Sequence, residues 1–145
     1  MTASYFLPAG AGEIAALGVV DMRVVADSAT TDGRFAVAEF RGGAGPWTVR
    51  HAHEHMEESF YVLEGAFAFS VGDETLDAQA GSFVYVPRGT AHIMTAAPGG
   101  GALLTVFSPG GLEEMFLELA KLGADALRDP ALRRQVASRF DSVPV

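Results

Sequence analysis

The chain has 145 residues and a formal net charge of −8, with 10 Lys and Arg residues against 18 Asp and Glu residues. This length predicts a single domain, residues 1–145, with its own core, and a hydrophobic fraction of 49% excludes an intrinsically disordered chain. The acidity argues against nucleic acid or an anionic membrane as a partner, and the absence of cysteine excludes disulfides, thiolate metal sites and cysteine nucleophiles.

The N-terminal residues 1–20 contain apolar stretches but no basic segment, so they do not match a signal peptide. No apolar run approaches the ~18 residues that a membrane span requires. We therefore expect a cytoplasmic location. A glycine-rich phosphate-binding loop is also missing from the sequence, which gives nucleotide binding no support.

Glycine and proline divide the first 111 residues into short runs rich in β-branched and aromatic residues, which is typical of an all-β domain. Alternation supports this: Phe67, Phe69 and Val71 share one face of a predicted strand. The runs predict strands over residues 19–26, 34–41, 47–54, 59–64, 66–72, 75–77, 82–86, 91–96 and 102–107.

After Pro109 the hydrophobic period changes from two residues to that of an α-helix, which predicts a helical tail over residues 111–141. The first helix carries one apolar stripe, formed by Leu112, Met115, Phe116, Leu119 and Leu122. Asp129 followed by Pro130 predicts the start of a second helix, with Leu132, Val136 and Phe140 on its buried side. We expect this tail to pack against the β-body, which we place at about 19–108, or against a partner subunit.

The chain has four histidines, and three of them fall within residues 51–55, at the end of one predicted strand. They are His51, His53 and His55. Residues two apart on a strand point to the same face, so the first two imidazoles could grip a metal ion together. A cluster of histidines on a strand can equally be a solvent-exposed face. The fourth, His92, follows a predicted turn and could complete a site from across a barrel, or be a core residue.

Glu58 has the same strand parity as Phe60 and Val62. If that face points inward, the sequence places a carboxylate in an apolar interior, where it needs a partner. A metal ion is the strongest partner available to it.

The spacing of these residues is specific. Gly45, His51, His53, Glu58 and Gly65 fit the pattern G-x5-H-x-H-x4-E-x6-G. A second pattern, G-x5-P-x-G-x2-H, is formed downstream by Gly81, Pro87, Gly89 and His92. These patterns resemble the two motifs of the cupin superfamily. The segment from Gly33 to Glu118 is similar to small bacterial cupins of the quercetin 2,3-dioxygenase-like type.

The resemblance implies an all-β cupin jelly roll or β-barrel with a metal in its mouth, in front of the C-terminal helical tail. It also implies the metal ligands, which would be His51, His53, Glu58 and His92. One position departs from the family pattern, because Ala96 stands where the second motif commonly ends in asparagine. That asparagine is not a ligand, so we expect the metal site to survive and its surroundings to be more apolar.

Such a ligand set suits one divalent transition metal ion and does not select among Fe, Mn, Ni, Co, Cu and Zn. The resemblance favours a dioxygenase-type oxidoreductase acting on a small aromatic or enolic substrate, flavonoid- or polyketide-like, with Glu58 as general base. Two alternatives stay open. One is a non-redox cyclase, isomerase or lyase of natural-product metabolism. The other is a non-catalytic cupin that binds a small molecule.

Strand parity with the ligands predicts a substrate pocket with hydrophobic walls, formed by Trp47, Val49, Phe60, Val62 and Met94. We expect its ligand to be a small hydrophobic or aromatic molecule. His55 could lie at the lip of this pocket or in the solvated turn between the two motif strands. The resemblance also implies a homodimer.

Overall fold

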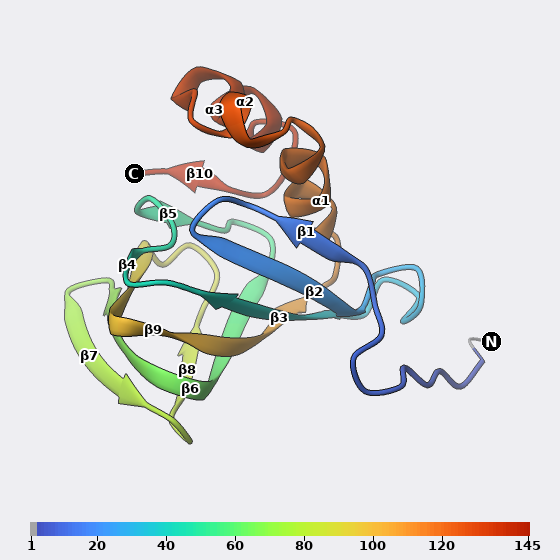
Figure 1. Ribbon diagram of the computed structural model, residues 1–145, viewed down its shortest axis with the longest axis horizontal. Helices are drawn as coiled ribbons and strands as arrows, with labels where there is room; N and C mark the ends of the chain where they lie inside the picture. Colours follow the sequence, from blue (N-terminus) through green and yellow to red (C-terminus); the bar gives the residue numbers. More distant parts are fainter. Residues whose placement is uncertain (1–2) are drawn as a thin grey trace.

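The computed structural model describes residues 3–145 and shows a β-body covered on one side by helices (Figure 1). The strands are β1 (Ile14–Ala16), β2 (Val20–Ala26), β3 (Ala36–Gly42), β4 (Gly45–Pro46), β5 (His51–Ala52), β6 (Glu57–Val71), β7 (Glu74–Gln79), β8 (Phe83–Val86), β9 (His92–Ser108) and β10 (Val143–Pro144). The helices are α1 (Glu113–Lys121), α2 (Ala124–Leu127) and α3 (Pro130–Ala137). All strand pairs are antiparallel.

Two long strands, β6 and β9, form the centre of the sheet and pair from Glu57 opposite Ser108 to Val71 opposite His92, with irregularities on both sides of Gly65. Strands β8 and β7 pair with successive halves of β6, and β3 pairs with the second half of β9. The path β1-β2-β3-β9-β5-β10 continues the sheet on the other side. Helix α1 follows β9 directly, so the sheet leads from the β-body into the helical cover.

The predicted breaks at Gly65 and at residues 98–101 are wrong, because each lies inside a continuous strand. Gly65 has a positive φ of +74°, and it lies at an irregularity in the register between β6 and β9. The residues on both sides of each glycine segment pair with the same partner strand, so the strands bend there and do not reverse. Because of this bend, the first half of β6 pairs with β8 and the second half pairs with β7.

At this bend the backbones of neighbouring strands touch each other. A Cβ atom at Gly65 would overlap the carbonyl oxygen of Gly100, and one at Gly100 would overlap that of Gly42. A Cβ atom at Gly42 would in turn overlap the carbonyl oxygen of Val19. We call Gly42, Gly65 and Gly100 the glycine line, because together they cross β3, β6 and β9 at one level.

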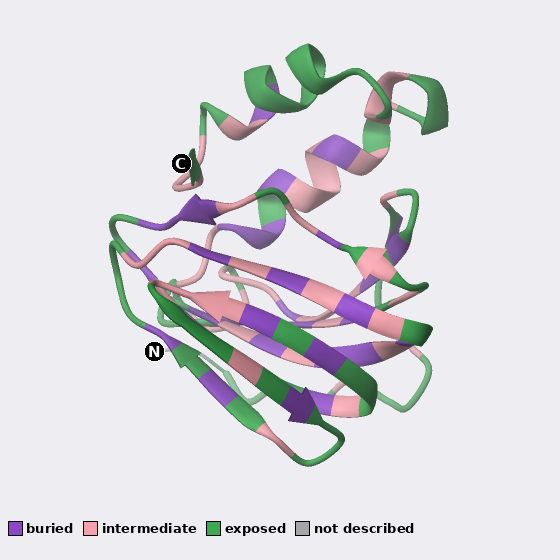
Figure 2. Cartoon of the chain, turned by 90° about the vertical axis from the view of Figure 1, so that its left-hand side faces the viewer, coloured by how far each residue is buried: buried purple, intermediate pink, exposed green. Residues whose placement is uncertain are grey.

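The core lies inside the β-body and continues under α1 (Figure 2). Phe67 and Phe69 are buried as their alternation predicted, with Val71 partly buried beyond them. The apolar stripe of α1 is confirmed: Leu112, Met115 and Leu119 are buried, and Phe116 and Leu122 pack against them. Phe116 also meets the ring of Phe40 edge-on, with the ring centroids 5.2 Å apart.

Helix α3 begins as the sequence predicted, with the Asp129 side chain accepting a hydrogen bond from Ala131 N and proline in the first turn. Val136 is its buried residue. Leu132 was predicted on the buried side and is exposed, because the short helix lies at the rim of the cover and turns this residue outward. No helix among residues 3–145 is long and apolar enough to cross a membrane.

Both ends of the helical cover are fastened to the β-body. At the start of α1, the fully buried Glu113 accepts hydrogen bonds from Ser28 N and Gly111 N, at 2.7 and 2.6 Å. At the other end, β10 pairs with β5. The predicted strand 47–54 is shorter than expected, since only 51–52 and the preceding 45–46 are strand. The intervening residues leave the sheet and border a cavity under the helices.

Candidate metal centre

Four side chains meet in the interior at the end of the β-body that faces the helices. His51 comes from β5, His53 from the loop after it, Glu58 from β6 and His92 from the start of β9. One nitrogen or oxygen atom of each lies within 4.8 Å of all the others. All four residues are buried, with at most 7% of their surface exposed. The structure thus brings together the four residues that the resemblance implied as ligands.

Backbone carbonyls fix the orientation of all three imidazoles. The Nδ1 atoms of His51, His53 and His92 lie 2.7, 2.5 and 3.0 Å from the carbonyl oxygens of Val49, Asp141 and Thr90. A carbonyl only accepts hydrogen bonds, so each Nδ1 carries the proton and donates it. This leaves Nε2 of each neutral ring with a free electron pair, the arrangement that metal-ligating histidines adopt.

The contacts of Glu58 test whether this donor set fits a cation. Its Oε2 atom lies 2.9 Å from His53 Nε2 and 3.0 Å from His92 Nε2. With neutral rings, electron pairs would face one another across both contacts, so the cluster needs either extra protons or a positive ion. Three imidazole nitrogens and one carboxylate oxygen suit a divalent transition metal. The buried cluster is therefore consistent with a divalent metal site.

The pKa shifts within the cluster result from burial and from the contacts among its four residues. Burial lowers the pKa of His51 to about 4, with His92 acting in the same direction, so His51 is neutral at pH 7. Burial also acts to lower the pKa of His53, but contact with Glu58 outweighs it and the pKa is raised. For Glu58, burial opposes ionisation, yet hydrogen bonds from His53 and His92 lower its pKa to about 2. The cluster therefore holds an ionised carboxylate whose hydrogen-bond partners are the imidazoles of His53 and His92.

Two adjoining cavities extend from the cluster. The outer cavity, about 330 Å³, lies between the loop before β5, the helices and the C-terminal residues, and His51, His53 and Glu58 form part of its wall. The inner cavity, about 60 Å³, lies between the β-body and the helices and also reaches Glu58. Residues that border both cavities are Trp47, Thr48, Glu58, Phe116, Leu119 and Arg133. The volume of the outer cavity is in the range of small-molecule sites.

The residues predicted for the pocket wall divide into four groups. Trp47 borders both cavities, Phe60 and Met94 border the inner one, and Val49 borders the outer one with most of its surface exposed. Val62 is fully buried in the core and borders neither cavity.

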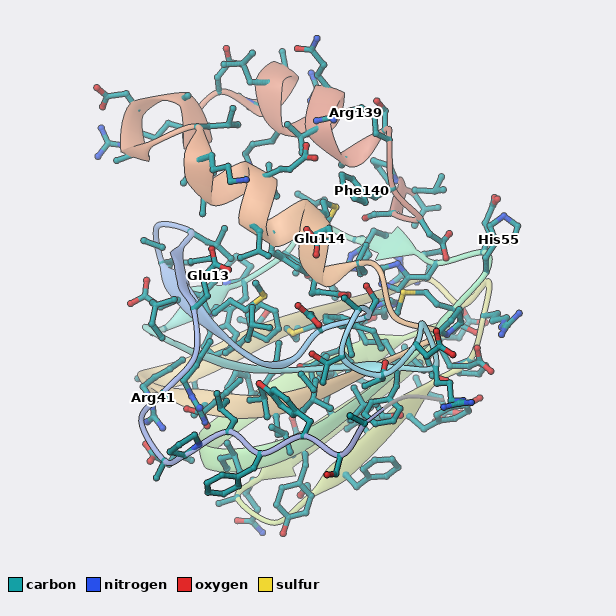
Figure 3. The ribbon with its side chains drawn as sticks, turned by 90° about the vertical axis from the view of Figure 1, so that its right-hand side faces the viewer. Glu13, Arg41, His55, Glu114, Arg139 and Phe140 are labelled. Carbon is teal, nitrogen blue, oxygen red and sulfur yellow. The ribbon has the colours of Figure 1, made fainter. Side chains whose placement is uncertain are left out.

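His55 takes the second of its two expected placements. It points away from the body into solvent (Figure 3), with 81% of its side chain exposed and Glu54 beside it. The chain turns outward directly after His53, so His55 does not follow the inward direction of the other two histidines.

Sequence reasoning missed several residues that shape this site. Thr48 and Thr105 border the inner cavity, and Phe116 and Arg133 bring the helices to its wall. The helical stripe predicted that Phe116 would be covered, but nothing in the sequence said what it would cover. Asp141 orients His53 from 88 residues away along the chain, and no local pattern marks such a contact.

Known proteins share this fold and sequence pattern. Residues 36–107 match the family model described as the cupin domain. The quercetin 2,3-dioxygenase of Bacillus subtilis (strain 168) is 32% identical over 115 residues, which cover 79% of this chain and 34% of that protein. The chain thus spans about a third of the length of this curated relative.

Two solved structures resemble the fold. KdgF from Halomonas sp. superimposes with a TM-score of 0.67 and 20% identity, covering 78% of this chain and 99% of that one. An RmlC-like cupin from Shewanella frigidimarina superimposes with a TM-score of 0.66 and 22% identity, covering 77% and 96%. The family model, the distant homology to quercetin 2,3-dioxygenase and the shared fold agree with the two sequence motifs, and we conclude that the chain belongs to the cupin family.

Proposed function

We propose that this cupin is a metal-dependent oxygenase of the dioxygenase type, acting on a small aromatic or enolic substrate of flavonoid- or polyketide-like character. The observation that carries the proposal is the buried cluster of three histidines and one glutamate at the wall of a mostly apolar cavity. The distant homology to a quercetin 2,3-dioxygenase supports the choice of reaction class.

His51, His53 and His92 would hold the ion through Nε2, since each Nδ1 is engaged by a carbonyl oxygen. When bound, a redox-active ion of this kind supplies Lewis acidity toward substrate oxygens and electron exchange with dioxygen. The apolar wall, with Trp47 and Phe116, would exclude water from the reacting ring. A dioxygenase places both atoms of O2 in its product, so the reaction needs no separate reductant.

Glu58 is the residue positioned to accept a proton from a substrate hydroxyl. It is ionised, buried and at the wall of both cavities. Its pKa of about 2 results from the hydrogen bonds with His53 and His92, and a carboxylate so stabilised is a weak base at neutral pH. Burial alone would raise that pKa. Those hydrogen bonds need a proton on Nε2 of each ring, and a ring that holds the metal through Nε2 cannot supply it. We infer that Glu58, without these hydrogen bonds in the metal-loaded protein, is the base that accepts the substrate proton.

The test is oxygen consumption by protein reconstituted separately with Fe, Mn, Ni, Co, Cu and Zn, with quercetin as the first substrate. We expect consumption with at least one redox-active metal and incorporation of both ¹⁸O atoms from ¹⁸O₂ into the products. Stoichiometric metal binding without oxygen consumption over a panel of flavonols, catechols and enols would refute the oxygenase and favour a non-redox lyase, isomerase or cyclase, or a binding protein.

Matched variants separate the roles of neighbouring residues. His53→Ala should lose the metal, whereas His55→Ala should keep it, because only the first ring points inward. Glu58→Gln should abolish turnover beyond what its metal loss explains. Glu57→Gln should not, since Glu57 is engaged with Arg88 outside the site.

A further inference from the structure

Two threonine hydroxyls inside the molecule have no hydrogen-bond partner among the described residues. They are Thr48 Oγ1, between β4 and β5, and Thr105 Oγ1, in the middle of β9. The side chain of Thr105 is fully buried. An unmet buried hydroxyl costs about 1–3 kcal/mol, and such groups are rare in folded proteins unless something else satisfies them. Both threonines border the inner cavity, so a group placed there could satisfy them.

Packing alone does not account for threonine at these two positions. Most of the side chains that line the inner cavity are apolar, among them Phe40, Trp47, Phe60 and Met94, and its charged residues are Glu58 and Arg133. Valine has nearly the shape of threonine without the hydroxyl, so valine would line such a wall at lower cost. The two hydroxyls therefore indicate a ligand group that forms hydrogen bonds inside this mostly apolar cavity.

The sizes of the two cavities say which part of a ligand each can hold. The inner cavity, about 60 Å³, has room for a substituent of a few atoms, because a water molecule takes about 30 Å³. The outer cavity, about 330 Å³, has room for a ring system beside His51 and His53. The two cavities share Thr48 and Glu58 in their walls, so they adjoin each other beside the metal centre.

We propose that the substrate carries a hydroxyl or carbonyl substituent that enters the inner cavity and hydrogen-bonds Thr48 and Thr105, while its ring system lies in the outer cavity at the metal centre. The two threonines are then specificity-determining residues, and they select oxygen-substituted rings over plain ones. A threonine hydroxyl can donate or accept, so it suits either substituent. This inference rests on the proposed function for the aromatic or enolic character of the ligand.

The test compares two flavonols with the same metal-chelating group. Quercetin carries additional ring hydroxyls, and 3-hydroxyflavone lacks them. Metal-reconstituted protein is titrated with each in the absence of oxygen, so that no turnover occurs. Binding is followed by quenching of Trp47, the one tryptophan of the chain, which borders both cavities.

Wild-type protein should bind quercetin more tightly than 3-hydroxyflavone. Thr105→Val and Thr48→Val should each reduce that preference roughly 2- to 13-fold, the value of one neutral hydrogen bond, through a loss of affinity for quercetin. Thr105→Ser should retain the preference. Thr95→Val is the matched control, since Thr95 is also on β9 but borders a separate surface hollow. Melting temperatures check that each variant is folded.

The possible results separate the two proposals. Binding of both flavonols with no wild-type preference, or with a preference that Thr105→Val and Thr48→Val leave intact, would overturn the role of the threonines and leave the proposed function standing. Failure of both flavonols to bind the metal-loaded wild-type protein would exclude a flavonol-like substrate and overturn the inference with it.

Discussion

Replacing Asp141 with asparagine tests whether the C-terminal segment takes part in the metal centre. The Asp141 carboxylate accepts hydrogen bonds from Glu54 N and His55 N, at 2.7 and 2.8 Å, and its carbonyl oxygen accepts one from His53 Nδ1. An asparagine amide can accept only one of the two backbone hydrogen bonds, because its NH2 group would face the other N–H. The substitution therefore loosens the loop that carries one of the ligands.

The size of the effect follows from that one lost bond. A hydrogen bond to a charged group contributes about 1.5–3 kcal/mol, and we take the lower end because the Glu54 and His55 loop is exposed. If the metal-bound arrangement of His53 depends on this bond, a loss of ~1.5 kcal/mol raises the dissociation constant for the metal about tenfold. Outer-sphere partners of ligating histidines have effects of this order, about 10- to 100-fold.

The assay is a competition titration of Zn²⁺ and Ni²⁺ against a chromophoric chelator, on wild type, Asp141→Asn and Asp125→Asn. Asp125 is the control, since it lies fully exposed on α2 beside Arg128. We expect weaker metal binding in Asp141→Asn alone, with an unchanged circular dichroism spectrum. Wild-type metal affinity in that variant, even with a lower free energy of unfolding, would show that the segment stabilises the fold without positioning His53.

Three further predictions concern stability. Glu113→Ala should lower the free energy of unfolding by about 3 kcal/mol in urea denaturation, because it leaves two backbone N–H groups without their carboxylate acceptor. The exposed neighbour Glu114 provides the control, and an equal effect of Glu114→Ala would contradict the reasoning. Gly65→Ala should cost at least ~3 kcal/mol or prevent folding, since the new methyl group meets backbone at a positive φ; a melting temperature within a few degrees of wild type would disprove this contact. The free energy of unfolding of the metal-free protein should fall by roughly 3 kcal/mol as the pH is lowered from 6.5 to 4, because His51, with a folded pKa of about 4, binds its proton less readily than in the unfolded chain. A free energy of unfolding that does not change over this range, or a pH dependence that His51→Gln leaves unchanged, would count against it.

The sequence predicted the metal centre more completely than the cavity beside it. His51, His53, Glu58 and His92 stand at a spacing set by the path of β5, β6 and β9, so the pattern along the chain carries the geometry. No such pattern marks Thr105, because the lack of a hydrogen-bond partner for its hydroxyl depends on which residues the neighbouring strands and α1 place around it.

Backbone conformation set a second limit on what could be predicted. Gly65 was expected to end a strand, as glycine with a positive φ commonly does. Residues on both sides of it pair with the same strand, and this pairing is a long-range fact that local turn chemistry does not contain. The pairing of β10 with β5 was missed for the same reason, because two residues carry too little pattern to predict a strand.

The glycine line has a consequence for how this fold tolerates change. Contact between backbones, and not the chemistry of any ligand, restricts Gly42, Gly65 and Gly100 to glycine. In a library of all single substitutions, these positions should form a band of intolerance across three strands, even in a screen that reads only the amount of folded protein. The cavity threonines should show the opposite behaviour, tolerated for abundance and restricted for binding. The two maps together would separate the residues that shape the barrel from those that select its ligand.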